Sequence, residues 1–143
     1  MSHYSLIGTI IKNLNSLVAA LKMCGFSQKA IEISSELLEL RGYKGDVRKQ
    51  RANVRIKGSG WAGENYVGGA SNDLGFELMP DGTYAFHVSD YDRGKYGPNW
   101  QKELFANYSQ DVTIKELELD GFQLEEVQET SKSKRRLVLR RSC

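Results

Sequence analysis

The residues best suited to hold a metal ion or act as nucleophiles are few and widely spaced. The only histidines are His3 and His87, and the only cysteines are Cys24 and Cys143. Zinc sites need His and Cys ligands at short, characteristic spacings, and these four residues show none of them. His87 lies in the alternating stretch 84–89, opposite in direction to its neighbours, so we expect it on the solvent face. The sequence predicts no catalytic, cofactor-binding or metal-ligating residue.

Two carboxylates two residues apart form the next candidate. Asp90 and Asp92 flank Tyr91 at the end of a predicted strand. Such a pair could hold a divalent cation or exchange protons with a substrate. The neighbouring Arg93 and Gly94 are typical of a solvated loop, and Asp is a common turn residue. We therefore interpret Asp90 and Asp92 as turn residues.

A glycine-rich stretch, residues 58–69, matches the string G-x-G-x-x-G at Gly58, Gly60 and Gly63. A dinucleotide site needs a helix directly behind this string, because the helix N-terminus binds the pyrophosphate. The residues that follow are a poor helix start. We expect instead a flexible or partner-ordered loop that presents Trp61 and Tyr66, since exposed aromatic side chains are common at interfaces.

Charge is distributed in blocks, although the formal net charge is only +2. Residues 41–57 are basic, residues 103–129 are mostly acidic, and residues 132–141 are basic again. Such blocks usually form solvated faces that pair with one another, and binding of nucleic acid by the first block is the alternative. The candidate contact residues are Arg41, Tyr43, Arg48, Arg51, Arg55, Trp61 and Tyr66.

Length and composition are those of one globular domain, residues 1–143. A chain of 143 residues can bury a core without disulfide or metal staples. We expect Cys24 to be a small buried hydrophobe and Cys143 an exposed thiol. The N-terminus lacks the pattern of a signal peptide, and Lys12 and Lys22 interrupt the most apolar stretch, so we expect no membrane insertion. The expected location is intracellular, in cytoplasm or plastid stroma.

Periodicity predicts strands and two helices. The first half suggests a central strand over Leu6 to Ile11, and then a helix that Asn13 caps and Gly25 ends. Residues 27–40 fit either period, and we favour a turn followed by a strand near Leu37 to Arg41. Another strand is expected over Ala52 to Lys57.

The second half begins with a hairpin. Leu74, Phe76 and Leu78 alternate before Pro80-Asp81-Gly82-Thr83, and Tyr84, Phe86 and Val88 follow. A helix capped by Asn99 carries Trp100, Leu104 and Tyr108 on one face. Its pattern fades at 111–113, with resumption to Leu119 left open and a stop at Gly121. A last hairpin joins Phe122–Glu129 to Arg135–Arg140 around Thr130-Ser131-Lys132-Ser133. The predicted fold is α+β, a mainly antiparallel sheet with two helices on one face.

Several short segments, in order along nearly the whole chain, resemble the uncharacterised ycf-thirty-five family, which is named for a hypothetical chloroplast reading frame of plastids, cyanobacteria and other bacteria. They are Met1-Ser2-His3-Tyr4-Ser5 with the helix to Gly25, Arg41-Gly42-Tyr43-Lys44-Gly45, Asp73-Leu74-Gly75-Phe76-Glu77, Asp81-Gly82-Thr83-Tyr84, and 121–122 through 137–141. The resemblance implies no activity or cofactor, so it carries over no catalytic residue.

These observations favour a non-enzymatic accessory or protein-interaction module, with the glycine loop and the edge of the final hairpin as contact surfaces. A protein is therefore the expected partner. A nucleic-acid-associated module that uses the basic segment 41–57 is the alternative, and an enzyme of unknown type is the third interpretation.

Overall fold

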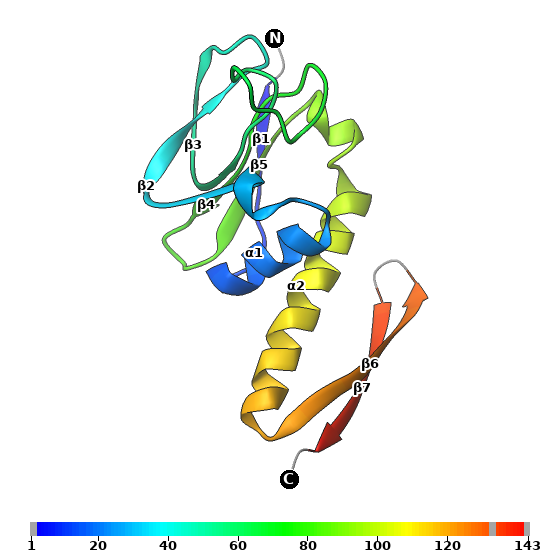
Figure 1. The fold of residues 1–143 in the computed structure, drawn as a ribbon. Coiled ribbons are helices and arrows are strands. Elements are labelled where there is room, and N and C mark those ends of the chain that lie inside the picture. Colours follow the sequence, from blue (N-terminus) through cyan, green and yellow to red (C-terminus); the bar gives the residue numbers. More distant parts are fainter. Residues whose placement is uncertain (1–2, 132–133, 142–143) are drawn as a thin grey trace. The chain divides into compact units, whose positions relative to one another are not determined.

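The computed structural model describes residues 3–131 and 134–141. Contacts divide the chain into two compact units, residues 1–12 with 26–97 and residues 13–25 with 98–143. The elements, labelled in Figure 1, are β1 (Tyr4–Ile7), α1 (Leu14–Met23), η1 (Gln28–Ala30), β2 (Ile31–Arg41), β3 (Val47–Ile56), β4 (Leu74–Leu78), β5 (Tyr84–Ser89), η2 (Asp92–Gly94), α2 (Pro98–Leu119), β6 (Phe122–Ser131) and β7 (Lys134–Arg141).

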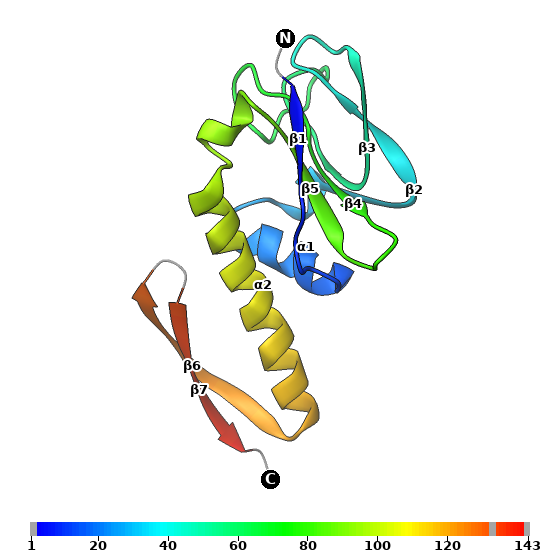
Figure 2. The ribbon, with the colours of Figure 1, turned by 180° about the vertical axis from the view of Figure 1, so that it is seen from behind.

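The first unit is built on a five-stranded sheet in the order β1-β5-β4-β3-β2, and every neighbouring pair is antiparallel. Figure 2 shows β1 and β5 side by side from behind. Phe76 of β4 faces Phe86 of β5, and their ring centroids lie 4.8 Å apart. Both side chains are buried, so this cross-strand pair lies in the core of the unit. The predicted α+β class with a mainly antiparallel sheet is confirmed.

The β4–β5 hairpin forms as the sequence predicts. Gly82 adopts a φ of +87°, which glycine reaches without steric cost. The Asp81 carboxylate accepts hydrogen bonds from the Thr83 amide at 2.9 Å and the Thr83 hydroxyl at 2.6 Å. Because these contacts are local, turn chemistry alone identifies the connection.

The first strand differs from its prediction. It spans Tyr4–Ile7 rather than residues 6–11, and it lies at the edge of the sheet rather than at its centre. Leu6 and Ile10 are 54% and 68% exposed. The Thr9 hydroxyl donates to the Tyr84 carbonyl and accepts from the Ile11 amide, so the chain leaves the regular ladder there. Apolar residues on both faces were therefore a poor guide to position in the sheet.

Residues 31–41 form one long strand, β2, which settles the ambiguity between helix and strand. The favoured strand near Leu37 to Arg41 is part of it, although the strand starts earlier. The register with β3 shifts between Ile33 and Leu38, where Asn53 Nδ2 donates to the Ser34 carbonyl at 3.3 Å. This irregularity breaks the alternation of side chains, and it explains the mixed periodicity of the sequence.

The second unit contains the two helices. Asn13 caps α1 as predicted, because its side-chain oxygen accepts from the Ser16 amide at 3.0 Å. Gly25 follows the helix with a φ of +108°. Leu17 and Leu21 are buried in the apolar stripe of α1. None of the helices in the described residues is long and apolar enough to cross a membrane.

The long helix α2 corrects two predictions. It begins at Pro98, which suits the first helical turn, so Asn99 lies inside the helix. It also continues through residues 111–113 to Leu119, with an ion pair of 2.9 Å between Lys115 Nζ and Asp111 Oδ2. The polar stretch is therefore a solvated helical face rather than a break. Leu104 and Tyr108 are buried as expected, and Gly121 ends the turn after the helix.

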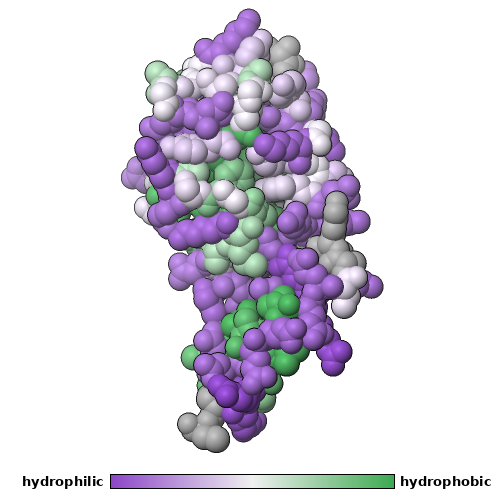
Figure 3. Space-filling model, turned by 45° about the vertical axis from the view of Figure 1, so that its right-hand side comes forward, coloured by the Kyte–Doolittle hydropathy of each residue, from purple (hydrophilic) through white to green (hydrophobic). Residues whose placement is uncertain are grey.

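The last hairpin forms, but β6 and β7 make a separate two-stranded sheet. Leu124 faces Leu139 and Val127 faces Leu137, which places apolar side chains on one face of the ribbon. Figure 3 shows apolar atoms bordered by hydrophilic ones in this part of the protein. Lys132, Ser133 and Cys143, and the predictions that concern them, lie outside the described residues.

Candidate functional site

A buried polar segment, Ser71 to Asp73, organises the loops at one end of the five-stranded sheet. Its members are at most 1% exposed. The Asp73 carboxylate accepts hydrogen bonds from the Arg41 amide at 2.8 Å, the Gly58 amide at 2.8 Å and the indole nitrogen of Trp61 at 2.9 Å. One side chain therefore ties the end of β2 to the first residues of the glycine-rich loop, 58–61.

The backbone of Asp73 adds two more ties. Its amide donates to the Arg41 carbonyl at 3.0 Å, and its carbonyl accepts from the Tyr4 hydroxyl at 2.6 Å. Burial raises the pKa of the Asp73 carboxyl, although the three hydrogen bonds that it accepts oppose the shift. Burial, with the charge of Asp73 nearby, also raises the pKa of the Tyr4 hydroxyl. Tyr4 is therefore a structural donor rather than an acid.

Asn72 extends this network to two further turns. Its side-chain oxygen accepts from the Tyr43 amide at 2.9 Å, and its side-chain nitrogen donates to the Ser89 hydroxyl at 2.8 Å. Its backbone amide donates to the Asp92 carboxylate at 2.9 Å. Burial raises the pKa of Asp92, against hydrogen bonds from Asn72 and Ser89. The turns at Tyr43 and Asp92 are consequently held by the same residue.

The glycines of the loop are explained by close backbone packing. A Cβ on Gly60 would overlap the Gly42 carbonyl oxygen, and a Cβ on Gly58 would lie 2.6 Å from the Asn72 carbonyl oxygen. The Gly58 amide, which a phosphate cradle would need, already donates to Asp73. No helix follows the loop. The turn 42–45 and the loop 58–61 therefore lie against each other, and the G-x-G-x-x-G string has a structural role.

Three cationic side chains lie against the ring of Trp61. The centroid lies 3.8 Å from the guanidinium carbon of Arg41, 4.6 Å from that of Arg55 and 4.4 Å from Lys57 Nζ. Each such contact contributes about 0.5–1 kcal/mol when exposed. Trp61 is half-buried, and its nitrogen is bonded to Asp73, so the indole is held in place rather than free. The expectation of a flexible loop around Trp61 does not match this bonding.

Two of the three cations are neutralised within the sheet. Arg55 is nearly buried and donates to both carboxylate oxygens of Glu32, the shorter contact being 2.7 Å, while Lys57 lies 3.4 Å from Glu32 and from Glu64. Burial alone would raise the pKa of Glu32, but the hydrogen bond and charge of Arg55 lower it. Glu32 and Glu64 lie outside the acidic block 103–129, so these pairs do not test the expectation that the charged blocks pair with one another.

Arg41 differs from its two neighbours. Among the described residues, no carboxylate lies within ion-pair distance of its guanidinium, and its Nε is buried without a hydrogen-bond partner. The residue is half-buried, and Tyr43, two positions on, is 42% exposed. Arg41 thus presents an unneutralised charge, stacked on an aromatic ring, next to an exposed aromatic side chain. We call Arg41, Tyr43 and Trp61 the Trp61 surface.

Three other predicted contact residues have contacts of their own, and Arg48 lines a shallow hollow together with Tyr43. Arg48 stacks on Tyr4 at 5.2 Å and lies 3.9 Å from Asp46. Arg51 is exposed on β3, opposite Glu39 of β2. Tyr66 is half-buried, and its amide donates to the Lys57 carbonyl at 2.9 Å.

The burial of His87 and Asp92 was not predicted from the sequence. His87 is 5% exposed, and its Nε2 lies 2.8 Å from Glu77 Oε1, so the prediction of a solvent-facing His was wrong. All six residues of β5 are buried, and alternation cannot reveal a strand buried on both faces. Asp90 and Asp92 do occupy a turn, but they diverge: Asp90 is exposed and Asp92 is buried.

Three residues of the site, Asn72, Asp73 and Glu32, were not predicted from the sequence. Asn and Asp directly before a strand are typical side-chain acceptors for backbone amides, which was the available signal. Within residues 3–131 and 134–141, no group of three or more His, Cys, Asp or Glu side chains is placed to hold a metal ion.

Comparison with curated proteins and with solved structures finds no match. A family model does match, over residues 20–138, which is most of the chain. Its description is "Protein of unknown function (DUF1257)". The matched range includes β2 to β5, the loop 58–73, the whole of α2 and the last turn of α1. The chain therefore belongs to this uncharacterised family, DUF1257.

Proposed function

We propose that the chain is a non-enzymatic accessory protein that binds a protein partner through the Trp61 surface. The observation that carries this proposal is the Arg41 guanidinium, which stacks on Trp61 and has no carboxylate partner among the described residues. Arg, Trp and Tyr are the residue types that contribute most to binding at protein interfaces. An acidic group of a partner would complete the ion pair.

Pre-ordering of the loops supports the same proposal. Asn72 and Asp73 hold the turn 42–45 and the loop around Trp61 through buried hydrogen bonds. A surface that is ordered before binding loses little conformational entropy when the complex forms. The polar network therefore serves recognition as well as stability. The compartment that we expect is the cytoplasm or the plastid stroma.

The test is a pull-down of the tagged full-length chain from native extract after nuclease treatment. We expect a protein partner to be retained by the wild type and lost by the double variant Arg41→Ala/Tyr43→Ala. The matched control is Lys29→Ala/Leu78→Ala, which removes one exposed cation and one exposed apolar side chain elsewhere in the same unit. Recovery of the wild type alone, at monomer mass, would contradict the proposal.

A nucleic-acid-associated module is the second candidate. Lys49 and Arg51 are exposed on β3, and no ion pair to either is recorded among the described residues. Pairing of Arg48, Arg55 and Lys57 within the fold leaves fewer free cations than the sequence suggests. Loss of every partner on nuclease treatment, with salt-dependent retention on DNA or RNA, would favour this candidate.

A further inference from the structure

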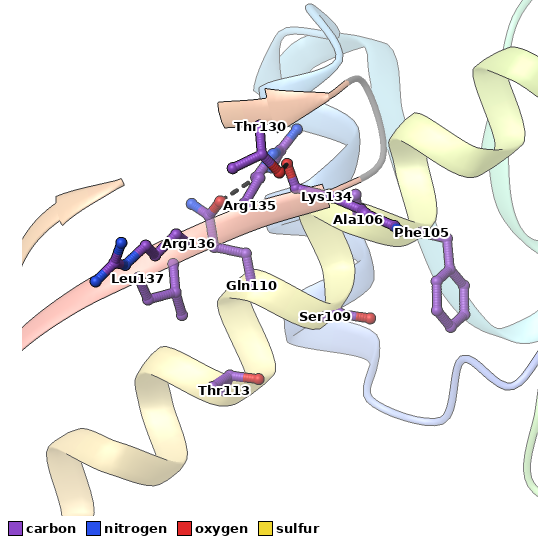
Figure 4. A pocket seen from close by; sticks show the side chains of 10 residues that line it. All are labelled: Phe105, Ala106, Ser109, Gln110, Thr113, Thr130, Lys134, Arg135, Arg136 and Leu137. Carbon is purple, nitrogen blue, oxygen red and sulfur yellow. Dashed lines mark hydrogen bonds between the residues drawn. The ribbon is translucent and has the colours of Figure 1, made fainter. Parts of the chain in front are cut away.

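A groove of about 640 Å³ lies between α2 and β7 in the second unit. Figure 4 shows Ser109 and Thr113 of α2 on one side and the strand segment Lys134 to Leu137 on the other. Arg135 spans part of the gap, since its Nη1 donates to the Gln110 side-chain oxygen at 3.0 Å. The groove is open to solvent and contains no part of the first unit.

Four consecutive residues of β7, Lys134 to Leu137, line this groove. Thr130 of β6 lines the groove at one end. Successive side chains of a strand point to opposite faces, so the part of the groove that all four residues of β7 line runs along an edge of that strand. The opposite edge of β7 is paired with β6. In the part of the chain that the structure describes, no strand pairs with the groove edge. Its outward N–H and C=O groups are therefore available to an added strand.

The native partner of β7 indicates which side chains suit this strand. β6 is acidic, and Arg140 lies 3.5 Å from Glu125 while Arg135 lies 3.6 Å from Glu129. Opposite charges on neighbouring strands stabilise the pairing, and like charges destabilise it. β7 thus already pairs with an acidic strand on one edge.

Two cations on the groove side remain unmatched. Lys134 and Arg136 are exposed, and no ion pair to either is recorded within residues 3–131 and 134–141. On the helix, Ser109 and Thr113 are one turn apart, so their short side chains leave room for a backbone beside β7. A second copy of this chain is a poor occupant in a symmetric arrangement, because β7 against β7 would oppose cations with cations.

We propose that the groove edge of β7 binds an extended acidic segment of a partner protein as an added strand. Main-chain hydrogen bonds would give affinity, and Lys134 and Arg136 would select acidic side chains. This surface lies in the other unit from the Trp61 surface, and the inference goes beyond the proposed function and does not depend on it. The competing interpretation is that Lys134 and Arg136 only protect an exposed edge from aggregation.

The experiment measures binding of a fluorescent nine-residue peptide, in which Glu alternates with Thr and Val, to the full-length chain by anisotropy. We expect saturable binding that weakens by about two- to thirtyfold in Lys134→Gln/Arg136→Gln, since two exposed charged contacts are lost. The control Lys22→Gln/Lys102→Gln removes two exposed cations of the same unit outside the groove and leaves the affinity unchanged. Circular dichroism confirms that both variants fold.

Two further probes separate strand addition from simple charge attraction. A peptide with Pro at its centre cannot donate there, so its affinity falls at least about tenfold. Amide hydrogen exchange slows at alternate residues of 134–137 when the acidic peptide binds. Absence of binding to the wild type would overturn the proposal in favour of edge protection. Equal binding of the Pro peptide, or of an oligothymidylate of equal charge, would overturn it in favour of a diffuse basic surface.

Discussion

The indole nitrogen of Trp61 lies 2.9 and 3.0 Å from the two carboxylate oxygens of Asp73, which is 0% exposed. The same carboxylate accepts the Arg41 and Gly58 amides. A buried carboxylate is costly unless its oxygens are hydrogen-bonded, and here three donors satisfy them. The position of the Trp61 ring, and of the Arg41 guanidinium stacked on it, therefore depends on Asp73.

Replacement of this carboxylate should destabilise the fold strongly. Asp73→Ala leaves the Arg41 amide, the Gly58 amide and the Trp61 indole without an acceptor, and each buried unsatisfied donor costs about 1–3 kcal/mol. We expect the free energy of unfolding in urea to fall by about 3 kcal/mol or more. The control, Asp90→Ala, removes an exposed carboxylate and should change it by less than about 0.5 kcal/mol. Equal losses in the two variants would show that the Asp73 bonds contribute no net stability.

Asp92 should make stability depend on pH. Burial raises its folded-state pKa above the ordinary value of 3.8, so the folded chain holds the proton more tightly than the unfolded chain. Its contribution is fully present below pH 3.8 and is lost as the pH rises through the folded-state pKa. Glu32, whose pKa is lowered, acts in the opposite direction.

The measurement is the difference in unfolding free energy between wild type and Asp92→Asn as a function of pH. Because Asn does not titrate, this difference isolates the contribution of Asp92. We expect the wild type to lose stability relative to Asp92→Asn as the pH rises above 3.8. A flat difference across this window would mean that Asp92 titrates alike in both states.

The same substitution, Gly to Ala, should reduce stability at one glycine of the loop and have almost no effect at another. A Cβ on Gly60 would overlap the Gly42 carbonyl, whereas nothing lies within 4 Å of one on Gly69. Gly60→Ala should lower the free energy of unfolding by about 1–3 kcal/mol, because the backbone of the turn 42–45 must shift. Gly69→Ala should stay within about 0.5 kcal/mol of wild type. Urea unfolding of both variants checks this contrast, and similar values for the two would contradict the close packing of the loop against Gly42.

The elements that were predicted correctly are those determined by residues close together in the sequence, such as helix caps and turn residues. The β4–β5 hairpin follows from alternation and from Asp81 and Gly82, and α1 follows from the Asn13 cap and Gly25. The errors arose where position depends on distant segments. β1 is an edge strand rather than the predicted central strand, because strand pairing is decided by the whole chain.

The candidate site was predicted in part for the same reason. Arg41, Arg55 and Trp61 were recognised from their types, and the structure brings them together. Asp73 was missed, because its role is visible only once Arg41, 32 positions earlier, and Tyr4, 69 positions earlier, are near it. Residue type alone does not reveal a buried acceptor.

The Cys24 thiol should react slowly with alkylating reagents. Burial raises its pKa to about 11, from an ordinary value of 9.0, although a hydrogen bond from Asn107 Nδ2 at 3.2 Å opposes the shift. At pH 8 its thiolate fraction is then about a hundredfold below that of an ordinary Cys. In a Cys143→Ser background, where Cys24 is the only thiol, we expect alkylation by iodoacetamide to be slower than that of a free Cys peptide by about tenfold or more, because the greater nucleophilicity of a more basic thiolate offsets part of the difference in thiolate fraction. A peptide-like rate would indicate that the region around Cys24 opens readily.

The two compact units should unfold together. The chain passes from one unit to the other three times, after residues 12, 25 and 97. Four strands of the first unit, β2 to β5, therefore separate α1 from α2 in the sequence. Neither unit is a continuous segment, and we therefore predict that residues 1–143 behave as one cooperative domain. The substitution Leu17→Ala removes a buried side chain of α1 in the second unit and leaves a cavity. It should lower the free energy of unfolding by about 2–5 kcal/mol.

Two probes of this variant distinguish one transition from two. In a Trp100→Phe background, Trp61 fluorescence reports only the first unit, while far-ultraviolet circular dichroism reports mainly α1 and α2. If the units are coupled, Leu17→Ala lowers the urea midpoint of both signals by the same amount, because the first unit cannot remain folded alone. A lower midpoint for the helical signal with an unchanged Trp61 transition would instead mean that the sheet unit is an independent domain.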